Sequence, residues 1–273
     1  MATRARAAVA ALAMLLIGCG ADPELTPRDH AYADDAVRCM SPPAEAVPAD
    51  GRLETPDRLD VQVRVPSNHR PDIAHPLLVV YAAAGMTPTA SERFTHFTAA
   101  ATAAGYVVAY VRHIRPSPAA VRKLGAVPAT VARHYCIDPR RVHATGHSDG
   151  GTTTTALAVQ PESAGMFSAI APSAAGFAGR DLADFACPAP RPVLVWHGAR
   201  DRLFPGWGRE AAAWWARCNG CALQPEPWPG GCVRYAGCTR PVHYCEGDSG
   251  HATWPSAATT STLAFFSETM QAP

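Results

Sequence analysis

Lysine is nearly absent from this chain of 273 residues, in which Lys123 is the one lysine beside 23 arginines. The formal net charge is only +1, so no excess of basic side chains points to a nucleic-acid partner. No apolar run reaches the ~20 residues that a membrane-spanning helix needs. Fingerprints for phosphate or dinucleotide binding are missing as well. Hydrophobic residues, by contrast, make up 48% of the chain and charged residues 17%, which is typical of a folded globular protein.

The first 18 residues have the pattern of an export signal. Two arginines precede an apolar segment, Ala7 to Ile17, which ends in Leu-Ile-Gly-Cys. This ending resembles the bacterial lipobox, in which the cysteine becomes the lipidated first residue. We therefore expect residues 1–18 to be a lipoprotein signal peptide and Cys19 to anchor the exported protein to a membrane surface, in the cell envelope or outside the cell. Residues 19–57, rich in proline, alanine and aspartate, are predicted to be a flexible tether.

Eight cysteines follow the one at the expected cleavage site. An even number in an exported chain favours disulfides, four at most. The alternative is zinc, because Cys218-x-x-Cys221 has ligand spacing, but Cys232 and Cys238 are too far apart to complete a zinc ribbon. We expect disulfides and no metal. The eight are Cys39, Cys136, Cys187, Cys218, Cys221, Cys232, Cys238 and Cys245.

Predicted strands and helices alternate through residues 58–273. Strands are expected at 59–65, 77–82, 106–111, 141–145, 168–171, 192–196 and 242–244, and helices at 91–104, 121–135, 150–159, 209–217 and 257–270. The period-two pattern of 59–65 is typical of a half-exposed edge strand, and the continuous apolar run at 77–82 of a buried parallel strand. The order predicts a single α/β domain, in which a mostly parallel sheet has helices on both faces and no large lid domain is inserted. Such sheets bind ligands at the carboxyl ends of their strands.

The strongest motif is G-H-S-D-G at residues 146–150, a G-x-S-x-G sequence. It falls between a predicted strand and a predicted helix, as a nucleophile elbow requires. The glycines permit the sharp turn that lifts the Ser148 hydroxyl above the sheet edge. The backbone N–H of Asp149 then points toward the oxyanion that develops on the substrate. We predict that Ser148 is the nucleophile and that Asp149 supplies one oxyanion-hole donor.

A serine nucleophile needs a base, and the base needs an acid that orients it. Hydrolases with this elbow carry the three in the order Ser, acid, His along the chain. Asp201 and His251 each follow a predicted strand, so both fall at the edge of the sheet where Ser148 lies. We expect His251 to take the serine proton and Asp201 to hold the imidazole tautomer. Asp248 and Asp184 are weaker candidates for the acid.

The loop after the strand at 77–82 is expected to supply the second oxyanion donor. Its residues are small and permit the backbone to approach a substrate closely. We assign the donor to Ala84, with Ala83 and Gly85 as alternatives.

A second serine segment, G-D-S-G at 247–250, looks like the serine segment of trypsin-like proteases. Those proteins are all-β and place His and Asp before the serine. Here His251 follows the segment and strands alternate with helices, so we do not adopt this interpretation.

Taken together, these motifs resemble those of the polyhydroxybutyrate depolymerase and feruloyl esterase group of α/β-hydrolases. The resemblance spans about residues 59–269 and rests on Arg64-Val-Pro66, Pro76-Leu-Leu-Val-Val80, Ile137-Asp-Pro-Arg-Arg-Val142, Gly146-His-Ser-Asp-Gly-Gly151, His197-Gly-x-x-Asp201 and Gly250-His-x-x-Trp-Pro255. It implies the α/β-hydrolase fold, a triad of Ser148, Asp201 and His251, and a disulfide between Cys221 and Cys238. The chain departs from the family in two places. It has two alanines, at positions 82 and 83, where the family usually has His-Gly, and one more residue than usual between the histidine and the tryptophan of the last segment.

The resemblance implies a secreted serine carboxylic ester hydrolase that works through an acyl-enzyme and needs no cofactor. Feruloyl or acetyl esters of polysaccharide are the expected substrates, and a short hydroxyalkanoate polyester such as polyhydroxybutyrate is the alternative. Trp207 and Trp254 lie close in sequence to Asp201 and His251, so we expect them to contact a planar acyl group or a sugar. A surface protein that keeps the fold only for binding is the alternative from a different functional class.

Overall fold

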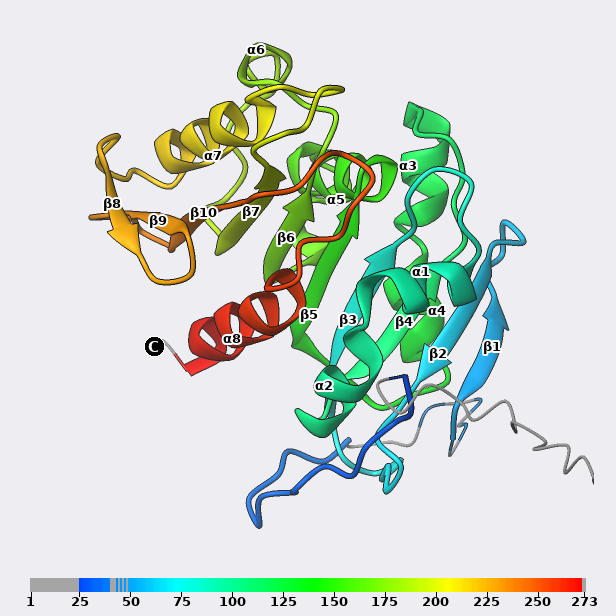
Figure 1. Ribbon diagram of the computed structural model, residues 1–273. Helices are drawn as coiled ribbons and strands as arrows, with labels where there is room; N and C mark the ends of the chain where they lie inside the picture. The colour runs from blue at the N-terminus through cyan, green and yellow to red at the C-terminus, as the bar shows by residue number, and fades with distance from the viewer. Residues whose placement is uncertain (1–24, 40–42, 44, 46, 48, 272–273) are drawn as a thin grey trace, which may run out of the picture.

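The strands of this protein form one sheet of ten, in a computed structural model that describes residues 25–271 except 40–42, 44, 46 and 48. The strands are β1 Gly51–Glu54, β2 Asp60–Arg64, β3 His75–Tyr81, β4 Val107–Val111, β5 Ile137–His147, β6 Ala169–Ser173, β7 Val193–Gly198, β8 Pro225–Trp228, β9 Cys232–Tyr235 and β10 Val242–Gly247. The helices are α1 Pro88–Thr95, α2 Phe97–Ala103, α3 Pro118–Leu124, α4 Val127–Ala132, α5 Asp149–Val159, the 3₁₀ turn η1 Ala164–Met166, α6 Gly179–Leu182, α7 Trp207–Cys218 and α8 Ala258–Gln271 (Figure 1).

The central strands of the sheet are parallel. The spatial order is β1-β2-β4-β3-β5-β6-β7-β10-β9-β8. Strands β4, β3, β5, β6, β7 and β10 run in one direction, and an antiparallel pair flanks them on each side. The carboxyl ends of the six parallel strands therefore meet at one edge, which confirms the mostly parallel sheet predicted from the sequence.

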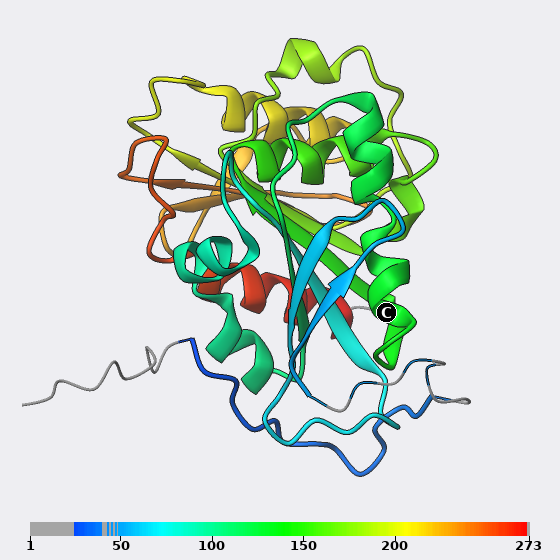
Figure 2. The same cartoon turned by 90° about the vertical axis from the view of Figure 1, so that its right-hand side faces the viewer.

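Helices cover both faces of this sheet (Figures 1 and 2). Helices α3, α4, α5 and α7 contribute their apolar residues to one hydrophobic cluster, and α2 and α8 contribute theirs to a second cluster on the opposite face. No separate lid domain occurs among the described residues.

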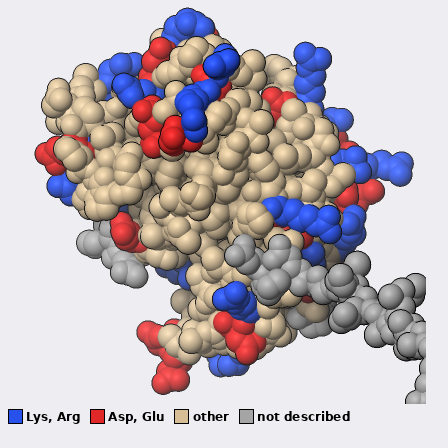
Figure 3. All heavy atoms as spheres, viewed as in Figure 1, with Lys and Arg blue, Asp and Glu red and all other residues tan. Residues whose placement is uncertain are grey.

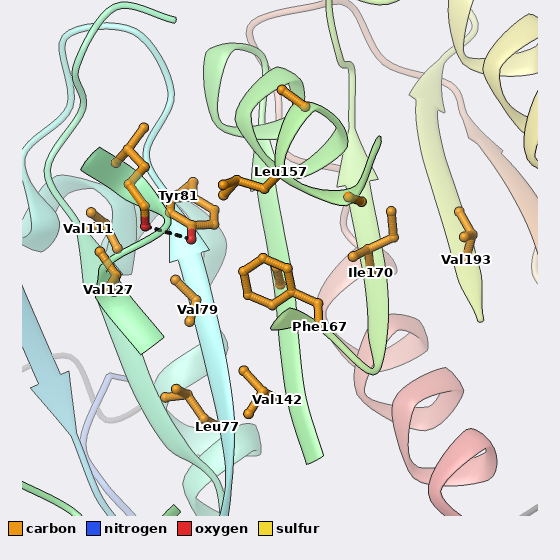
Figure 4. Packing of buried hydrophobic residues seen from close by; sticks show 14 of the residues in the cluster. Leu77, Val79, Tyr81, Val111, Val127, Val142, Leu157, Phe167, Ile170 and Val193 are labelled. Atoms are coloured by element: carbon orange, nitrogen blue, oxygen red, sulfur yellow. Dashed lines mark hydrogen bonds between the residues drawn. The ribbon is translucent and has the colours of Figure 1, made fainter. Parts of the chain in front are cut away.

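Strand β3 lies at the centre of the packing, and all seven of its residues are buried. Leu77, Val79 and Tyr81 alternate along the strand and point to the same side, where Leu157 and Phe167 pack beside them (Figure 4). The one polar atom in this group is satisfied, because the Tyr81 hydroxyl donates to a helix carbonyl at 3.2 Å. Burying each such apolar side chain contributes ~1.5–3 kcal/mol to the stability of the fold. Strand β3 is therefore a main source of packing energy at the centre of the sheet.

The sequence pattern predicted an edge strand at 59–65, and this prediction is wrong. Strand β2 is covered by β1, which pairs with it in antiparallel register. The alternation was misleading because its central polar residue, Gln62, is buried and donates to the carboxylate of Glu92. Glu92 is itself buried and paired with Arg64 at 2.8 Å. The polar side chain of Gln62 therefore faces a buried hydrogen-bonded network, and not the solvent that the alternating pattern implied.

The segment before β2 also differs from the prediction. Strand β1 lies within the range 19–57 assigned to the tether, yet it belongs to the sheet. Cys39 is bonded to Cys136, and the backbone of Arg28 donates to the Thr102 hydroxyl at 2.9 Å. The described part of this segment is therefore attached to the domain, and Cys19 and the signal peptide lie outside the described residues.

The helix predicted at 91–104 is two helices. His96, with φ 54°, adopts a left-handed conformation that ends α1, and α2 begins at the next residue. The change of direction buries Phe97 completely against Trp254, with ring centroids 5.6 Å apart. Tertiary packing thus overrides the continuous helical pattern.

All eight described cysteines form disulfides. The bonds are Cys39–Cys136, Cys187–Cys218, Cys221–Cys238 and Cys232–Cys245. The zinc alternative is excluded, since Cys218 and Cys221 belong to different disulfides, and the expected Cys221–Cys238 pair is present. Four disulfides indicate an oxidising compartment and hence an exported protein. Within the described residues, no helix has the length and apolar composition needed to cross a membrane.

Candidate active site

Ser148 occupies a strained turn between β5 and α5. Its backbone has φ 54° and ψ −117°, a region that residues with a side chain rarely adopt. The neighbouring glycines make the turn possible. A Cβ atom on Gly150 would lie 2.0 Å from the carbonyl oxygen of Tyr81, and one on Gly146 would lie 2.6 Å from the same atom. The backbone N–H of Ser148 donates to the Ser173 carbonyl at 3.0 Å, which ties the turn to β6.

The three residues predicted for the triad lie together at the carboxyl edge. The Ser148 hydroxyl oxygen is 2.8 Å from Nε2 of His251, and Nδ1 of His251 is 2.8 Å from Oδ2 of Asp201. These residues are 103 and 50 positions apart in the sequence. The segment between β10 and α8, which carries His251, crosses in front of the ends of β5 and β6 (Figure 1). The chain of contacts has the order and the lengths that proton transfer from a serine requires.

The Asp201 side chain has no exposed surface and is fully hydrogen-bonded. Its Oδ1 accepts the backbone N–H groups of Leu203 and Phe204, each at 2.9 Å, while Oδ2 faces His251. Burial by itself would raise the pKa of Asp201. The hydrogen bond from His251 and those from the backbone outweigh burial and hold the pKa below its ordinary value. Asp201 is therefore a carboxylate that keeps the proton of His251 on Nδ1 and leaves Nε2 free to accept.

His147, the second residue of the G-x-S-x-G motif, supports the segment that carries His251. Its Nε2 donates to the carbonyl oxygen of His251 at 2.6 Å, and its Nδ1 is 3.0 Å from the Ser173 hydroxyl. The ring is buried, and burial lowers its pKa to about 4. It is consequently neutral at physiological pH and acts through hydrogen bonds. The sequence analysis assigned no role to it.

Phe204 is the aromatic side chain next to the imidazole of His251. The two rings meet edge to face with centroids 5.0 Å apart. Trp207 stacks on the far side of Phe204, with ring centroids 4.7 Å apart, and makes no described ring contact with His251. The Arg180 guanidinium lies 5.4 Å from the centroid of the Trp207 ring. Trp207 is thus a second layer behind Phe204. Phe204 itself could not be singled out from the sequence, because it falls in a loop without a motif.

Trp254 is packed into the core rather than displayed beside His251. It is 8% exposed, and its indole N–H donates to the Thr259 hydroxyl at 2.9 Å. Phe94, Phe97 and His147 surround the ring at centroid distances of 6.2, 5.6 and 6.1 Å.

What remains exposed of Trp254 lines a cavity of about 750 Å³ between α1, α2 and residues 252–260. A larger cavity, of about 980 Å³, lies at the opposite edge of the sheet and is lined by His75, Arg141 and Arg191. Neither cavity is lined by a triad residue. The smaller one adjoins the loop of His251 through Ala252, Thr253 and Trp254.

The loop after β3 forms a tight turn next to the elbow. The N–H of Met86 donates to the carbonyl of Ala83 at 3.0 Å, and Gly85 has φ +74°. The N–H of Gly85 is already used, since it donates to Nδ1 of His113 at 3.1 Å. Gly85 is therefore the least suitable of the three oxyanion candidates, and the N–H groups of Ala84 and Ala83 remain. Asp149 is the first residue of α5, where a backbone N–H has no intrahelical partner.

The alternative acids and the alternative serine lie in other environments. Asp248 is 84% exposed and pairs with Arg200 at 3.1 Å. Asp184 is exposed, and Nδ1 of His251 is already bonded to Asp201. The Ser249 hydroxyl is buried and has no hydrogen-bond partner among the described residues. Together with the α/β architecture, this placement excludes the trypsin-like interpretation.

Comparisons with known proteins find solved structures of the same fold, several of which are esterases. No family model matches the chain, and no curated protein matches it. An acetyl xylan esterase from Aspergillus awamori superposes with a TM-score of 0.61 at 18% identity, over 80% of this chain and 99% of that enzyme. The S-formylglutathione hydrolase of Staphylococcus aureus gives 0.57 at 13% identity, over 80% and 97%, and Est1E from Butyrivibrio proteoclasticus gives 0.56 at 13% identity, over 82% and 98%. At these identities the likeness concerns the fold, and the chain has the α/β-hydrolase fold.

Proposed function

We propose that this protein is a serine carboxylic ester hydrolase that works through an acyl-enzyme. The observation that carries the proposal is the continuous hydrogen-bonded chain from Asp201 through His251 to Ser148, with the serine held on a strained turn. Three such groups in this order turn a weakly nucleophilic hydroxyl into an effective nucleophile. The neighbours on the same fold, which include esterases, support this reaction class.

In the first half of the reaction, Nε2 of His251 takes the proton as the Ser148 oxygen attacks the ester carbonyl. The imidazolium that results is stabilised by the buried Asp201 carboxylate, which stays ionised because its pKa is lowered. The developing oxyanion is bound by the N–H of Asp149 and by an N–H of the loop after β3, for which we retain Ala84. His251 then gives its proton to the departing alcohol.

In the second half, water replaces the alcohol and attacks the acyl-serine. His251 accepts a proton from this water, and the same two N–H groups bind the second oxyanion. The acid is released and the Ser148 hydroxyl is restored. The cycle needs only groups that the chain itself supplies, so no cofactor enters the proposal.

As substrates we propose acetyl esters of a polysaccharide, ahead of feruloyl esters. The acetyl xylan esterase among the structural neighbours supports this choice. The packing of Trp254 supports it too, because a buried, hydrogen-bonded indole offers little open ring surface to a planar aryl acyl group. The surface over α8 carries few charged side chains (Figure 3), which suits an uncharged ester.

We further propose that Cys19 anchors the enzyme to a membrane surface, on the basis of the Leu-Ile-Gly-Cys sequence alone. The variant Cys19→Ala should lose metabolic labelling with palmitate and leave the membrane fraction. Unchanged labelling would refute the anchor without affecting the proposed chemistry.

The proposed chemistry is tested by turnover and by covalent labelling. The protein should hydrolyse p-nitrophenyl acetate and acetylated xylan faster than methyl ferulate or polyhydroxybutyrate, and Ser148→Ala should lose on the order of 10⁴–10⁶ in kcat. A fluorophosphonate should label the wild type and not this variant. Ser249→Ala is the matched control and should still be labelled. Labelling lost in the control but kept in Ser148→Ala would overturn the proposal, as would a wild type that neither hydrolyses esters nor reacts with the probe.

A further inference from the structure

His113 lies between the two segments that we expect to bind the oxyanion. It follows β4, which is the neighbour of β3, and β3 in turn is the neighbour of β5. Its Nδ1 accepts the N–H of Gly85 at 3.1 Å, and its Nε2 is 2.8 Å from Oδ2 of Asp149. Its backbone N–H also donates to the carbonyl of Met86 at 3.1 Å. One residue therefore links the loop after β3 to the start of α5.

The two ring contacts define a single tautomer. Because the N–H of Gly85 points at Nδ1, that nitrogen must carry the lone pair, and the proton must lie on Nε2. Nε2–H then donates to the Asp149 carboxylate. A neutral imidazole in this one form satisfies both contacts, whereas the other tautomer would satisfy neither.

We propose that His113 is a positioning residue that fixes the oxyanion loop relative to the elbow. The proposal rests on the ester hydrolysis proposed above, because it concerns the same site. Gly85 stands at the point of the turn where φ is +74°, directly after Ala84, and the ring of His113 is the acceptor that holds its N–H. Without that acceptor the turn can rotate, and the N–H of Ala84 or Ala83 loses its fixed direction.

The contact with Asp149 has an electrostatic consequence. The side chain of Asp149 is negatively charged and belongs to the residue whose N–H is expected to face the oxyanion. A hydrogen bond from Nε2 of His113 stabilises this carboxylate and holds it against the ring of His113. The ring thus limits the repulsion between the carboxylate and the charge that develops on the substrate.

Two amide variants separate the two contacts. In His113→Asn the side-chain oxygen stands close to the position of Nδ1 and can accept from Gly85, but the side chain is too short to reach Asp149. In His113→Gln the amide nitrogen stands close to the position of Nε2 and can donate to Asp149, but the acceptor for Gly85 is lost. The backbone bond to Met86 is unchanged in both variants.

His134 offers a matched control. Its side chain is 16% exposed, like that of His113, and its Nε2 also contacts a carboxylate, that of Glu45, at 2.7 Å. It lies on the connection between α4 and β5, at the amino end of β5, whereas the elbow follows the carboxyl end of that strand. His134→Gln should therefore behave as the wild type in every activity measurement.

The readouts are kcat and KM for p-nitrophenyl acetate, the rate of fluorophosphonate labelling of Ser148, and Tm. Losing one oxyanion donor costs about 10²–10³ in kcat, so a misdirected donor in His113→Gln should cost about 10–100-fold in both kcat and labelling rate, with KM little changed. His113→Asn should recover most of that loss. Both variants should have similar Tm values, because each loses one hydrogen bond.

Equal losses in the two amide variants, or wild-type labelling in His113→Gln, would overturn the role of His113. The labelling rate keeps this outcome separate from failure of the proposed function, since the probe forms an anionic adduct at Ser148 without any ester turnover. A wild type that is labelled but hydrolyses no ester would contradict the proposed substrate chemistry, and the comparison between the variants would still decide about His113. A wild type that is not labelled at all would refute both.

Discussion

Acidification should destabilise this protein through His147. The ring is 4% exposed and lies between the carbonyl of His251 and the hydroxyl of Ser173. Burial lowers its pKa in the folded state to about 4, against 6.5 for a solvated histidine. Folding therefore prevents His147 from taking up a proton that it would bind in the unfolded chain.

The sign and the size of the effect follow from proton linkage. Between pH 6.5 and about 4 the unfolded state binds more protons at this residue than the folded state, so the free energy of unfolding falls as the pH falls. The contribution is about 1.4 kcal/mol per pH unit within the window and about 3 kcal/mol in total. Above pH 6.5 the contribution is complete and no further gain is expected.

The assay is denaturant unfolding of the wild type and of His147→Gln at several pH values between 4.5 and 7.5. The glutamine amide can still donate to the carbonyl of His251 but does not titrate. The slope of stability against pH should be shallower in the variant by up to about 1.4 kcal/mol per pH unit between pH 4.5 and 6. Other buried histidines contribute to both proteins alike and cancel. Identical slopes would refute the assignment of the acid sensitivity to His147.

Three further outcomes are expected. Asp201→Asn should lower kcat by about 10⁴ with an unchanged circular dichroism spectrum, since the imidazole loses its tautomer, and a loss below tenfold would contradict that role. Replacing Cys221 and Cys238 together by serine should cost about 2–5 kcal/mol in unfolding free energy, and the unfolded wild-type body, delipidated, should show no free thiol. Trp254→Ala should lower stability by about 3–5 kcal/mol and leave the ratio of kcat/KM for methyl ferulate and p-nitrophenyl acetate unchanged, whereas a selective loss on ferulate would show that the ring contacts the acyl group.

The parallel part of the fold was predictable because its signals are local. Continuous apolar runs such as 77–82 can be buried on both faces only in the middle of a sheet, and the structure confirms that position for β3. The edges were not predictable in the same way. The hairpin of β8 and β9 contains Pro225 and Pro227, which disfavour strands. It is held by the disulfides Cys221–Cys238 and Cys232–Cys245, whose pairing the residues alone left open.

The site was predictable to the extent that its residues follow strands. Ser148, Asp201 and His251 each come after the carboxyl end of a parallel strand, and the parallel sheet brings those ends together. His113 and Phe204 also follow strands, but they have no motif around them. Their positions depend on contacts with turns that the sequence does not specify, so only the three-dimensional structure could single them out.

The register of the sheet explains how residues from separate strand ends form one site. His147, Ser173, Trp196 and Cys245 lie opposite one another on β5, β6, β7 and β10, and Cys232 of β9 continues the same row. The elements that carry the proposed nucleophile, acid and base all leave the sheet just after this row. A slip of one residue in β10 would turn its side chains to the other face and move His251 away from the elbow. The disulfide between Cys245 and Cys232 joins two directly opposed residues, so it fixes the register of β10 against β9. This covalent link matters because the neighbouring edge strand β8 contains prolines, which lack the N–H groups that strand pairing requires.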